Sequence, residues 1–160
     1  MTEPERAADG DDAAGDPTDL DHPVTDDDGP VDVLVPIDGS EPSMRALRYA
    51  AQLVGAFGGS LHVVHFTAEE TEATRELIER AEAELAAAGI DADPEVDVDL
   101  EMDLRPAKHV GERIVELAEA EGYGHVVMGH HGAGTVERAI LGSAAETVVR
   151  AEAVPVTVVP

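Results

Sequence analysis

Short apolar runs alternate with stretches of helical periodicity along most of this chain, and this alternation constrains the fold more than any other feature. Runs rich in Val, Ile and Leu have the length of buried strands, whereas the stretches between them repeat apolar residues every three or four positions. The expected strands are residues 31–37, 61–66, 96–102, 125–128 and 156–159. The expected helices run from a Ser40 cap to the glycines at 58 and 59, and then over about 69–88, 107–121 and 143–152.

This order of elements predicts one domain of the α/β class. Units of this length favour a five-stranded parallel sheet with helices on both faces and right-handed crossovers, which is a Rossmann-like fold. The run at 96–102 alternates apolar residues with acids, which indicates an edge strand with one wetted face. Such sheets bind ligands beyond the carboxyl ends of their strands, where the strand order reverses. We therefore expect the site in the loops that begin at Asp38 and Gly129.

Residues 1–30 differ from the rest of the chain because they contain almost no large apolar side chain and hold 11 of the 35 acidic residues. Such a segment buries too little apolar surface to offset the entropy lost on ordering. We expect a disordered acidic tail at 1–30, followed by the folded domain at 31–160. The tail is either an interaction arm or a solvating extension.

The whole chain is strongly acidic, with 35 acidic and 10 basic residues and a formal net charge of −25. Nucleic acid and anionic membranes are not expected as partners, because both select a cationic protein surface. The composition resembles that of proteins from salt-accumulating halophilic archaea, where molar salt screens the repulsion, and an acidic protein from a high-GC mesophile is the alternative. The chain has no cysteine and no apolar run of about 18 residues, so we expect a cytoplasmic protein without disulfides or membrane spans.

The segment after the fourth expected strand is rich in glycine and ends where the last helix begins. Glycines let backbone amides approach a ligand, and the free N–H groups of a helix N-terminus attract an anion. Exposed amides at 129–132 and 142–144 could therefore receive a polyphosphate without a cationic side chain. The alternative is a loop that only makes a tight turn and lets helix pack on strand.

The spacing of this segment, G-x2-G-x9-G-S, resembles the ATP-binding signature of the universal stress protein family. The matching positions are Gly129, Gly132, Gly142 and Ser143. Similar family motifs are V-P-I-D-G-S at 35–40, L-H-V-V-H-F at 61–66 and A-V-P-V-T-V-V at 153–159. The resemblance covers residues 31–159 and implies the adenine nucleotide alpha hydrolase-like form of the expected fold.

The resemblance implies binding roles for nine residues. Pro36, Phe66 and Met128 would line an adenine pocket, although Phe66 and Met128 are also natural core residues. Asp38 would contact the ribose or a Mg²⁺ ion on the phosphates, although a carboxylate there could simply cap a turn. The remaining positions are Gly129 and Gly132 near the ribose and phosphates, and Gly142, Ser143 and Ala144 around the distal phosphates.

The resemblance also implies a function and a partner. We expect an ATP-binding regulatory protein of the stress response, with Mg²⁺ on the nucleotide, that forms a homodimer through the strand at 156–159. The chain departs from the family pattern at Leu104, where a glycine is usual, and at Gly124, where an acid is often found. Leu104 would alter the rim of the pocket.

Three alternatives stay open. The protein could be a slow ATPase or nucleotidyl-transfer enzyme, it could be a non-nucleotide interaction module, or it could bind another adenine nucleotide. No G-x-S-x-G elbow and no Walker lysine stands in the sequence, so no catalytic residue is assigned. His131 lies beside the expected phosphates and could contact them, whereas no two histidines have the spacing of a zinc hydrolase.

Overall fold

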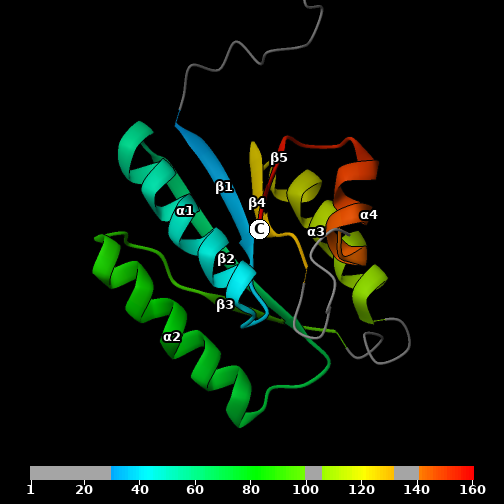
Figure 1. Cartoon of the computed structure of the whole chain (residues 1–160), viewed down its shortest axis with the longest axis horizontal. Coiled ribbons are helices and arrows are strands. Elements are labelled where there is room, and N and C mark those ends of the chain that lie inside the picture. Colours follow the sequence, from blue (N-terminus) through cyan, green and yellow to red (C-terminus); the bar gives the residue numbers. More distant parts are fainter. Residues whose placement is uncertain (1–29, 100–105, 132–140) are drawn as a thin grey trace, which may run out of the picture.

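The computed structural model of the 160-residue chain describes residues 30–99, 106–131 and 141–160, and these form one five-stranded sheet with helices on both faces (Figure 1). All strand pairs are parallel, in the order β3-β2-β1-β4-β5. The strands are β1 Val31–Pro36, β2 Gly59–Thr67, β3 Glu95–Val98, β4 His125–Gly129 and β5 Val156–Val159. The helices are α1 Glu41–Phe57, α2 Glu72–Ala88, α3 Pro106–Glu121 and α4 Ser143–Ala151. The expected fold class is confirmed.

Helices α1 and α2 cover one face of the sheet, and α3 and α4 cover the other (Figure 1). Successive residues of a strand point to opposite faces, so Val33 and Val35 of β1 pack with α1 and α2, while Leu34 packs with α3 and α4. A sheet covered on both faces buries every side chain of its central strands. This double burial explains why residues 33–36 of β1, which are all buried, are all apolar.

Strand β1 lies between β2 and β4, so the strand order reverses between β1 and β4. The chain leaves β1 towards one edge of the sheet and returns to β4 on the other side. A crevice therefore forms between the loops that follow these two strands. Strands β3 and β5 form the two edges, which agrees with the expectation for the third strand.

Two element boundaries differ from those predicted. Helix α2 begins at Glu72 rather than near residue 69, because Thr71 and Thr74 form a reciprocal capping box in which each side chain accepts the other residue's N–H. Strand β3 ends at Val98, and the predicted extension to residue 102 lies in part within 100–105, outside the described residues. The expected tail likewise lies outside them, apart from Pro30.

The sequence suggested that the acidic face of β3 is exposed to water, but in the structure this face packs against α3. Asp97 accepts a hydrogen bond from Arg113 of α3 at 2.8 Å, and Asp99 lies 2.9 Å from the ring nitrogen of His109. All four side chains are half-buried. The acids of this edge strand therefore face α3 and are neutralised by it, which explains how the strand carries them on a covered face. In the part of the chain that is described, no helix is long and apolar enough to cross a bilayer.

His125 makes the stability of the sheet depend on pH. Its Nε2 lies 2.9 Å from the Thr157 hydroxyl, and burial lowers the pKa of its ring from the usual 6.5. The unfolded chain therefore takes up the proton first, so the stability is fully present above about pH 6.5 and is lost as the pH falls through the lowered pKa. Urea unfolding between pH 5 and 8 should show wild type losing stability relative to His125→Gln only below about pH 6.5. Parallel pH profiles for the two proteins would contradict this assignment.

Candidate functional site

A cavity of about 240 Å³ lies at the carboxyl ends of β1 and β4, at the point where the strand order reverses. Its walls come from the ends of these strands, from the end of β2, and from the first turns of α1 and α4, with α3 closing one side. Eight of the nine residues assigned through the family resemblance line it: Pro36, Asp38, Phe66, Met128, Gly129, Gly142, Ser143 and Ala144. The ninth, Gly132, lies within 132–140, outside the described residues.

One part of the cavity wall is apolar and continuous with the core. Phe66 and Met128 are only 7% and 5% exposed, and they belong to the core cluster between the sheet and α3 and α4. Val110 and Ile114 of α3 line the same part of the cavity. Phe66 and Met128 are thus core residues that also line the cavity, so the two interpretations of these side chains are compatible. A flat apolar ring could be enclosed here.

The carboxylate of Asp38 is held in place directly after β1. Its Oδ1 accepts hydrogen bonds from the Ser40 amide at 3.0 Å and from the Ser40 hydroxyl at 2.6 Å. Ser40 also caps α1, since its hydroxyl oxygen accepts the N–H of Ser43. Asp38 itself is exposed. The turn between β1 and α1 therefore presents an oriented carboxylate at the mouth of the cavity, where a hydroxyl group or a cation could meet it.

The N-terminus of α4 supplies backbone donors to the same cavity. Helices α1 and α2 are capped by Ser40 and Thr71, but no described side chain caps α4, whose N-cap residue is Gly142. The first intrahelical bond of α4 runs from the Glu146 amide, so the preceding amides of the first turn have no partner within the helix. Their dipoles and that of the helix favour an anion.

The amide of Gly142 does not belong to this set, which corrects the expectation of exposed amides throughout 142–144. It donates to the carbonyl of His130 at 2.7 Å. A Cβ at Gly142 would lie 3.0 Å from the Cα of His131, so a larger residue would push these two closely packed backbone segments slightly apart. Gly142 thus joins the end of β4 to the start of α4 and positions the first turn of α4.

Gly129 also has a packing role that its motif does not reveal. A Cβ at this position would lie 2.8 Å from the Ser43 nitrogen and 2.9 Å from the carbonyl carbon of Pro42. The first turn of α1 therefore packs directly on the end of β4. The motif glycines at 129 and 142 are needed for backbone contacts within the protein, whatever they do for a ligand.

Sequence reasoning did not assign Ser43 and Ala145 to the site, and it treated Val110 and Ile114 only as the apolar stripe of a helix. Ser43 and Ala145 stand three residues into α1 and α4. The sequence did contain a signal for both residues, because each lies in the first turn of a helix that follows β1 or β4, the strands between which the order reverses.

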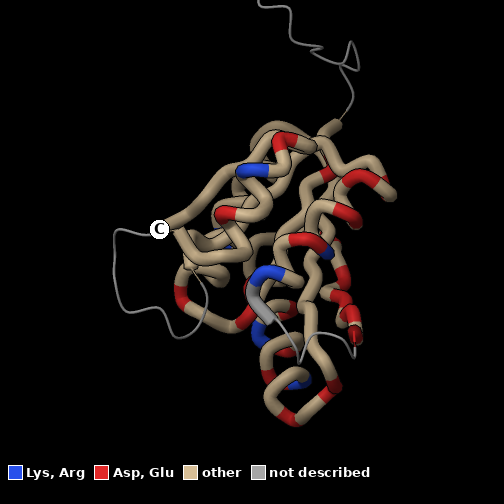
Figure 2. The backbone as a smooth tube through the Cα atoms, turned by 90° about the vertical axis from the view of Figure 1, so that its right-hand side faces the viewer, with Lys and Arg blue, Asp and Glu red and all other residues tan. Residues whose placement is uncertain are grey.

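The described residues that line the cavity include no Lys or Arg. Acidic positions are spread over the helices and loops of the molecule, with few basic ones between them (Figure 2). Within 30–99, 106–131 and 141–160, no three His, Cys, Asp or Glu side chains are grouped closely enough to hold a metal ion. A cation at this site would therefore need ligands from a bound molecule as well as from Asp38.

A family model described as the Universal stress protein family matches residues 32–160 of the chain. No match is found among curated proteins. A universal stress protein from Archaeoglobus fulgidus has the same fold, with a TM-score of 0.64 and 21% identity over 82% of this chain and 99% of that one.

Two similar structures were solved with a nucleotide. A universal stress protein in complex with cAMP has a TM-score of 0.60 and 26% identity, and the match covers 81% of this chain and 96% of that one. The universal stress protein from Archaeoglobus fulgidus in complex with dAMP has a TM-score of 0.61 and 19% identity over 82% of this chain and 98% of that one. At 19% identity the likeness shows the fold alone.

Proposed function

The chain belongs to the universal stress protein family, and from this premise we propose that it is a regulatory protein that binds ATP in the cavity between β1 and β4. One observation carries the proposal. The uncapped first turn of α4 shares a cavity with an apolar wall and an oriented carboxylate. These are the groups that the phosphates, the base and the ribose of a nucleotide require.

The nucleotide fits the cavity in one direction only. The adenine ring packs against Phe66 and Met128, where the wall is apolar. The ribose hydroxyls lie at Asp38, after β1, as a carboxylate at the end of a strand allows. The phosphates then extend towards the start of α4, where Ser143 offers its amide and its hydroxyl and Ala144 offers its amide.

The similar structures support adenine nucleotides as the ligand class. The complex with cAMP is 26% identical to this chain, and the complex with dAMP shares its fold. These complexes were solved with cAMP and dAMP, so the choice of ATP rests on the match to the ATP-binding motif at Gly129, Gly132, Gly142 and Ser143. Binding would act by favouring one conformation or one partner over another.

Mg²⁺ is part of this proposal. The chain carries a formal net charge of −25, so a bare triphosphate would meet strong repulsion. A Mg²⁺ ion usually keeps several waters and is bound by one or two carboxylates together with substrate phosphates. Asp38 is the carboxylate that lines the cavity and would share such an ion with the phosphates.

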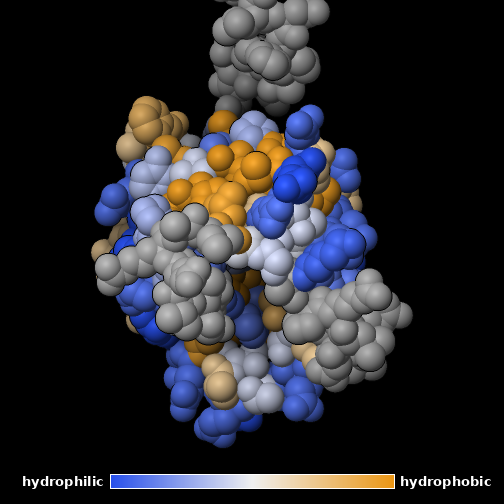
Figure 3. Space-filling model, turned by 45° about the vertical axis from the view of Figure 1, so that its right-hand side comes forward, coloured by the Kyte–Doolittle hydropathy of each residue, from blue (hydrophilic) through white to orange (hydrophobic). Residues whose placement is uncertain are grey.

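We also propose that β5 joins two copies of the chain. β5 is a sheet edge whose four residues are each only partly buried. Figure 3 shows hydrophobic side chains gathered on the upper part of the side that β5 and α4 occupy. Pairing with a second β5 would satisfy the open edge.

We further propose that the protein is located in the cytoplasm of a cell that accumulates salt. The strongly acidic composition fits both parts of this proposal.

Calorimetric titration with Mg·ATP tests the proposed function. The titration is best made in molar KCl, where the Debye length is about 3 Å and the repulsion of the acidic chain is screened. Wild type should bind one ATP per chain, and Asp38→Ala should weaken binding about tenfold or more, the value of a lost hydrogen bond to a charged group.

Asp91→Asn is the matched control, because Asp91 is an exposed carboxylate in the loop before β3, at the opposite end of the sheet. Its affinity should equal that of wild type. The absence of saturable binding of any adenine nucleotide by the folded wild-type protein would overturn the proposal and favour an interaction module.

A further inference from the structure

The cavity has an unusual balance of charge for a triphosphate site. Among the described residues that line it, Asp38 is acidic, and no Lys or Arg offsets that charge. The amide of Gly142, which would extend the donor row of α4, is already bonded to the His130 carbonyl. A triphosphate carries more negative oxygen atoms than the amides of the first turn of α4 can satisfy, so a further donor beside them would strengthen its binding.

His131 is the one basic side chain among the described residues that line the cavity. Its backbone is positioned by contacts of the preceding residue and by Gly142. The His130 amide donates to the Val159 carbonyl at 2.8 Å, and the His130 carbonyl accepts the Gly142 amide. Gly142 also packs against the His131 Cα. His131 is therefore held beside the uncapped start of α4, at the end of the cavity where phosphates would lie.

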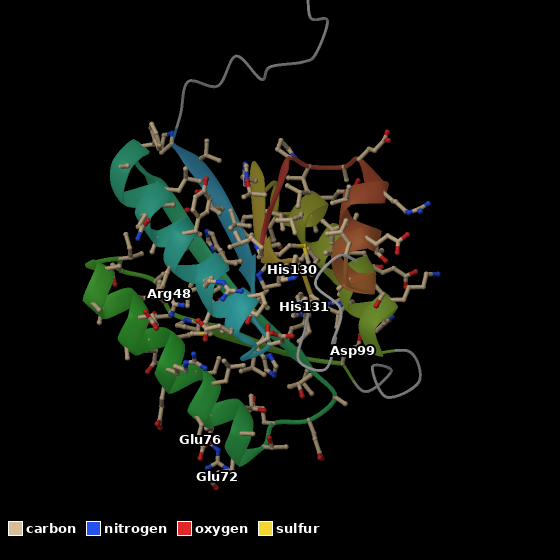
Figure 4. The ribbon with its side chains drawn as sticks, viewed as in Figure 1. Arg48, Glu72, Glu76, Asp99, His130 and His131 are labelled. Atoms are coloured by element: carbon tan, nitrogen blue, oxygen red, sulfur yellow. The ribbon has the colours of Figure 1, made fainter. Side chains whose placement is uncertain are left out.

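The neighbouring histidine has a different environment. The rings of His130 and His131 meet edge to face, with centroids 3.9 Å apart, and Figure 4 shows both following β4. His130 does not line the cavity, and its Nδ1 is buried without a hydrogen-bond partner among the described residues. His130 thus packs behind His131 and limits the orientations of its ring. Of this pair, only His131 can reach a ligand.

We propose that His131 donates a hydrogen bond to the phosphates and makes the site prefer a triphosphate over a monophosphate. The inference rests on the proposed function. Histidine has at least one ring N–H at any ordinary pH, and a second when it is protonated. In the proposed orientation AMP ends at the phosphate next to the ribose, before the start of α4, so it gains less from this side chain than ATP does.

Titrations of wild type, His131→Ala and His131→Gln with Mg·ATP and with AMP test the inference. His131→Ala should bind ATP about tenfold more weakly, which is the effect of losing one charge-assisted hydrogen bond, and its AMP affinity should change by less than about twofold. His131→Gln keeps an N–H donor to the charged phosphates but on a side chain of different shape, so it should lose only about threefold for ATP. His62→Ala is the control, because His62 is an exposed histidine towards the amino end of β2.

The outcomes separate the two proposals. If folded wild type binds neither nucleotide, the proposed function fails. If wild type binds ATP but the ratio of ATP to AMP affinity is unchanged in both variants, only the role of His131 is overturned. An equal loss of affinity for both nucleotides, together with a lower thermal midpoint, would mark His131 as structural and would also overturn this inference. A loss confined to ATP supports it.

Discussion

Replacing Gly59 with alanine is expected to lower the free energy of unfolding by about 3–5 kcal/mol, the sum of a strained backbone and an overpacked contact. Gly59 begins β2 with a φ of +124°, a conformation that side chains rarely adopt. A Cβ there would overlap the carbonyl oxygen of Val31 in the paired strand β1. Relief of the overlap requires β1 and β2 to separate at their amino ends, where the two strands begin to pair.

The adjacent glycine provides a matched control. Gly58 has a φ of +81°, and a Cβ there would meet no atom within 4 Å. Gly58→Ala should therefore show only the cost of the backbone conformation, about 1–3 kcal/mol. Urea unfolding of the two variants and wild type measures the difference. Equal losses for Gly58→Ala and Gly59→Ala would show that β1 and β2 yield easily and would contradict the prediction.

Replacing Ala144 with proline is expected to weaken Mg·ATP binding about 10- to 100-fold, since a backbone donor to a charged phosphate is removed. Ala144 is the second residue of α4, where no described side chain caps the helix. Proline has no N–H, and its ring would also occupy space beside the bound phosphates. The helix itself should persist, because α1 carries Pro42 at the same position of its first turn.

Ala144→Ser is the control for this change, since it keeps the amide and adds only a hydroxyl. Its ATP affinity should stay within about threefold of wild type, a difference of under 1 kcal/mol. Far-ultraviolet circular dichroism and the thermal midpoint establish that both variants are folded. Wild-type affinity in a folded Ala144→Pro protein would show that the phosphates do not lie at the start of α4.

The alternation of strands and helices in the sequence was sufficient to predict the fold class. The central strands are covered on both faces, so consecutive residues in their middle are apolar, as Val33, Leu34 and Val35 show. The helices bury one side only and therefore repeat their apolar residues at helical spacing. The reversal between β1 and β4 arises where the chain passes from β3 across β2 and β1 to β4. That reversal placed Asp38 and Gly129 at one edge of the sheet.

Helix starts and side-chain partners were less predictable from the sequence than the order of the elements. The sequence did not indicate that Thr71 and Thr74 cap α2, because a helix start further upstream has similar local propensity. The acids of β3 suggested a wetted face, whereas Asp97 and Asp99 pair with α3. Which residues neutralise them depends on how α3 lies over β3, and no local pattern records this.

The sequence by itself determined the order of the elements, the parallel sheet and the end of the sheet at which a ligand can bind, because these follow from the periodicity of apolar residues. Only the tertiary structure decided how the motif glycines are used. The Gly142 amide is bonded to His130, Gly129 makes room for the first turn of α1, and His131 lines the cavity near the start of α4. These roles depend on contacts between segments far apart in the chain, and a hydrogen-bond donor can serve a ligand only if no such contact has already used it.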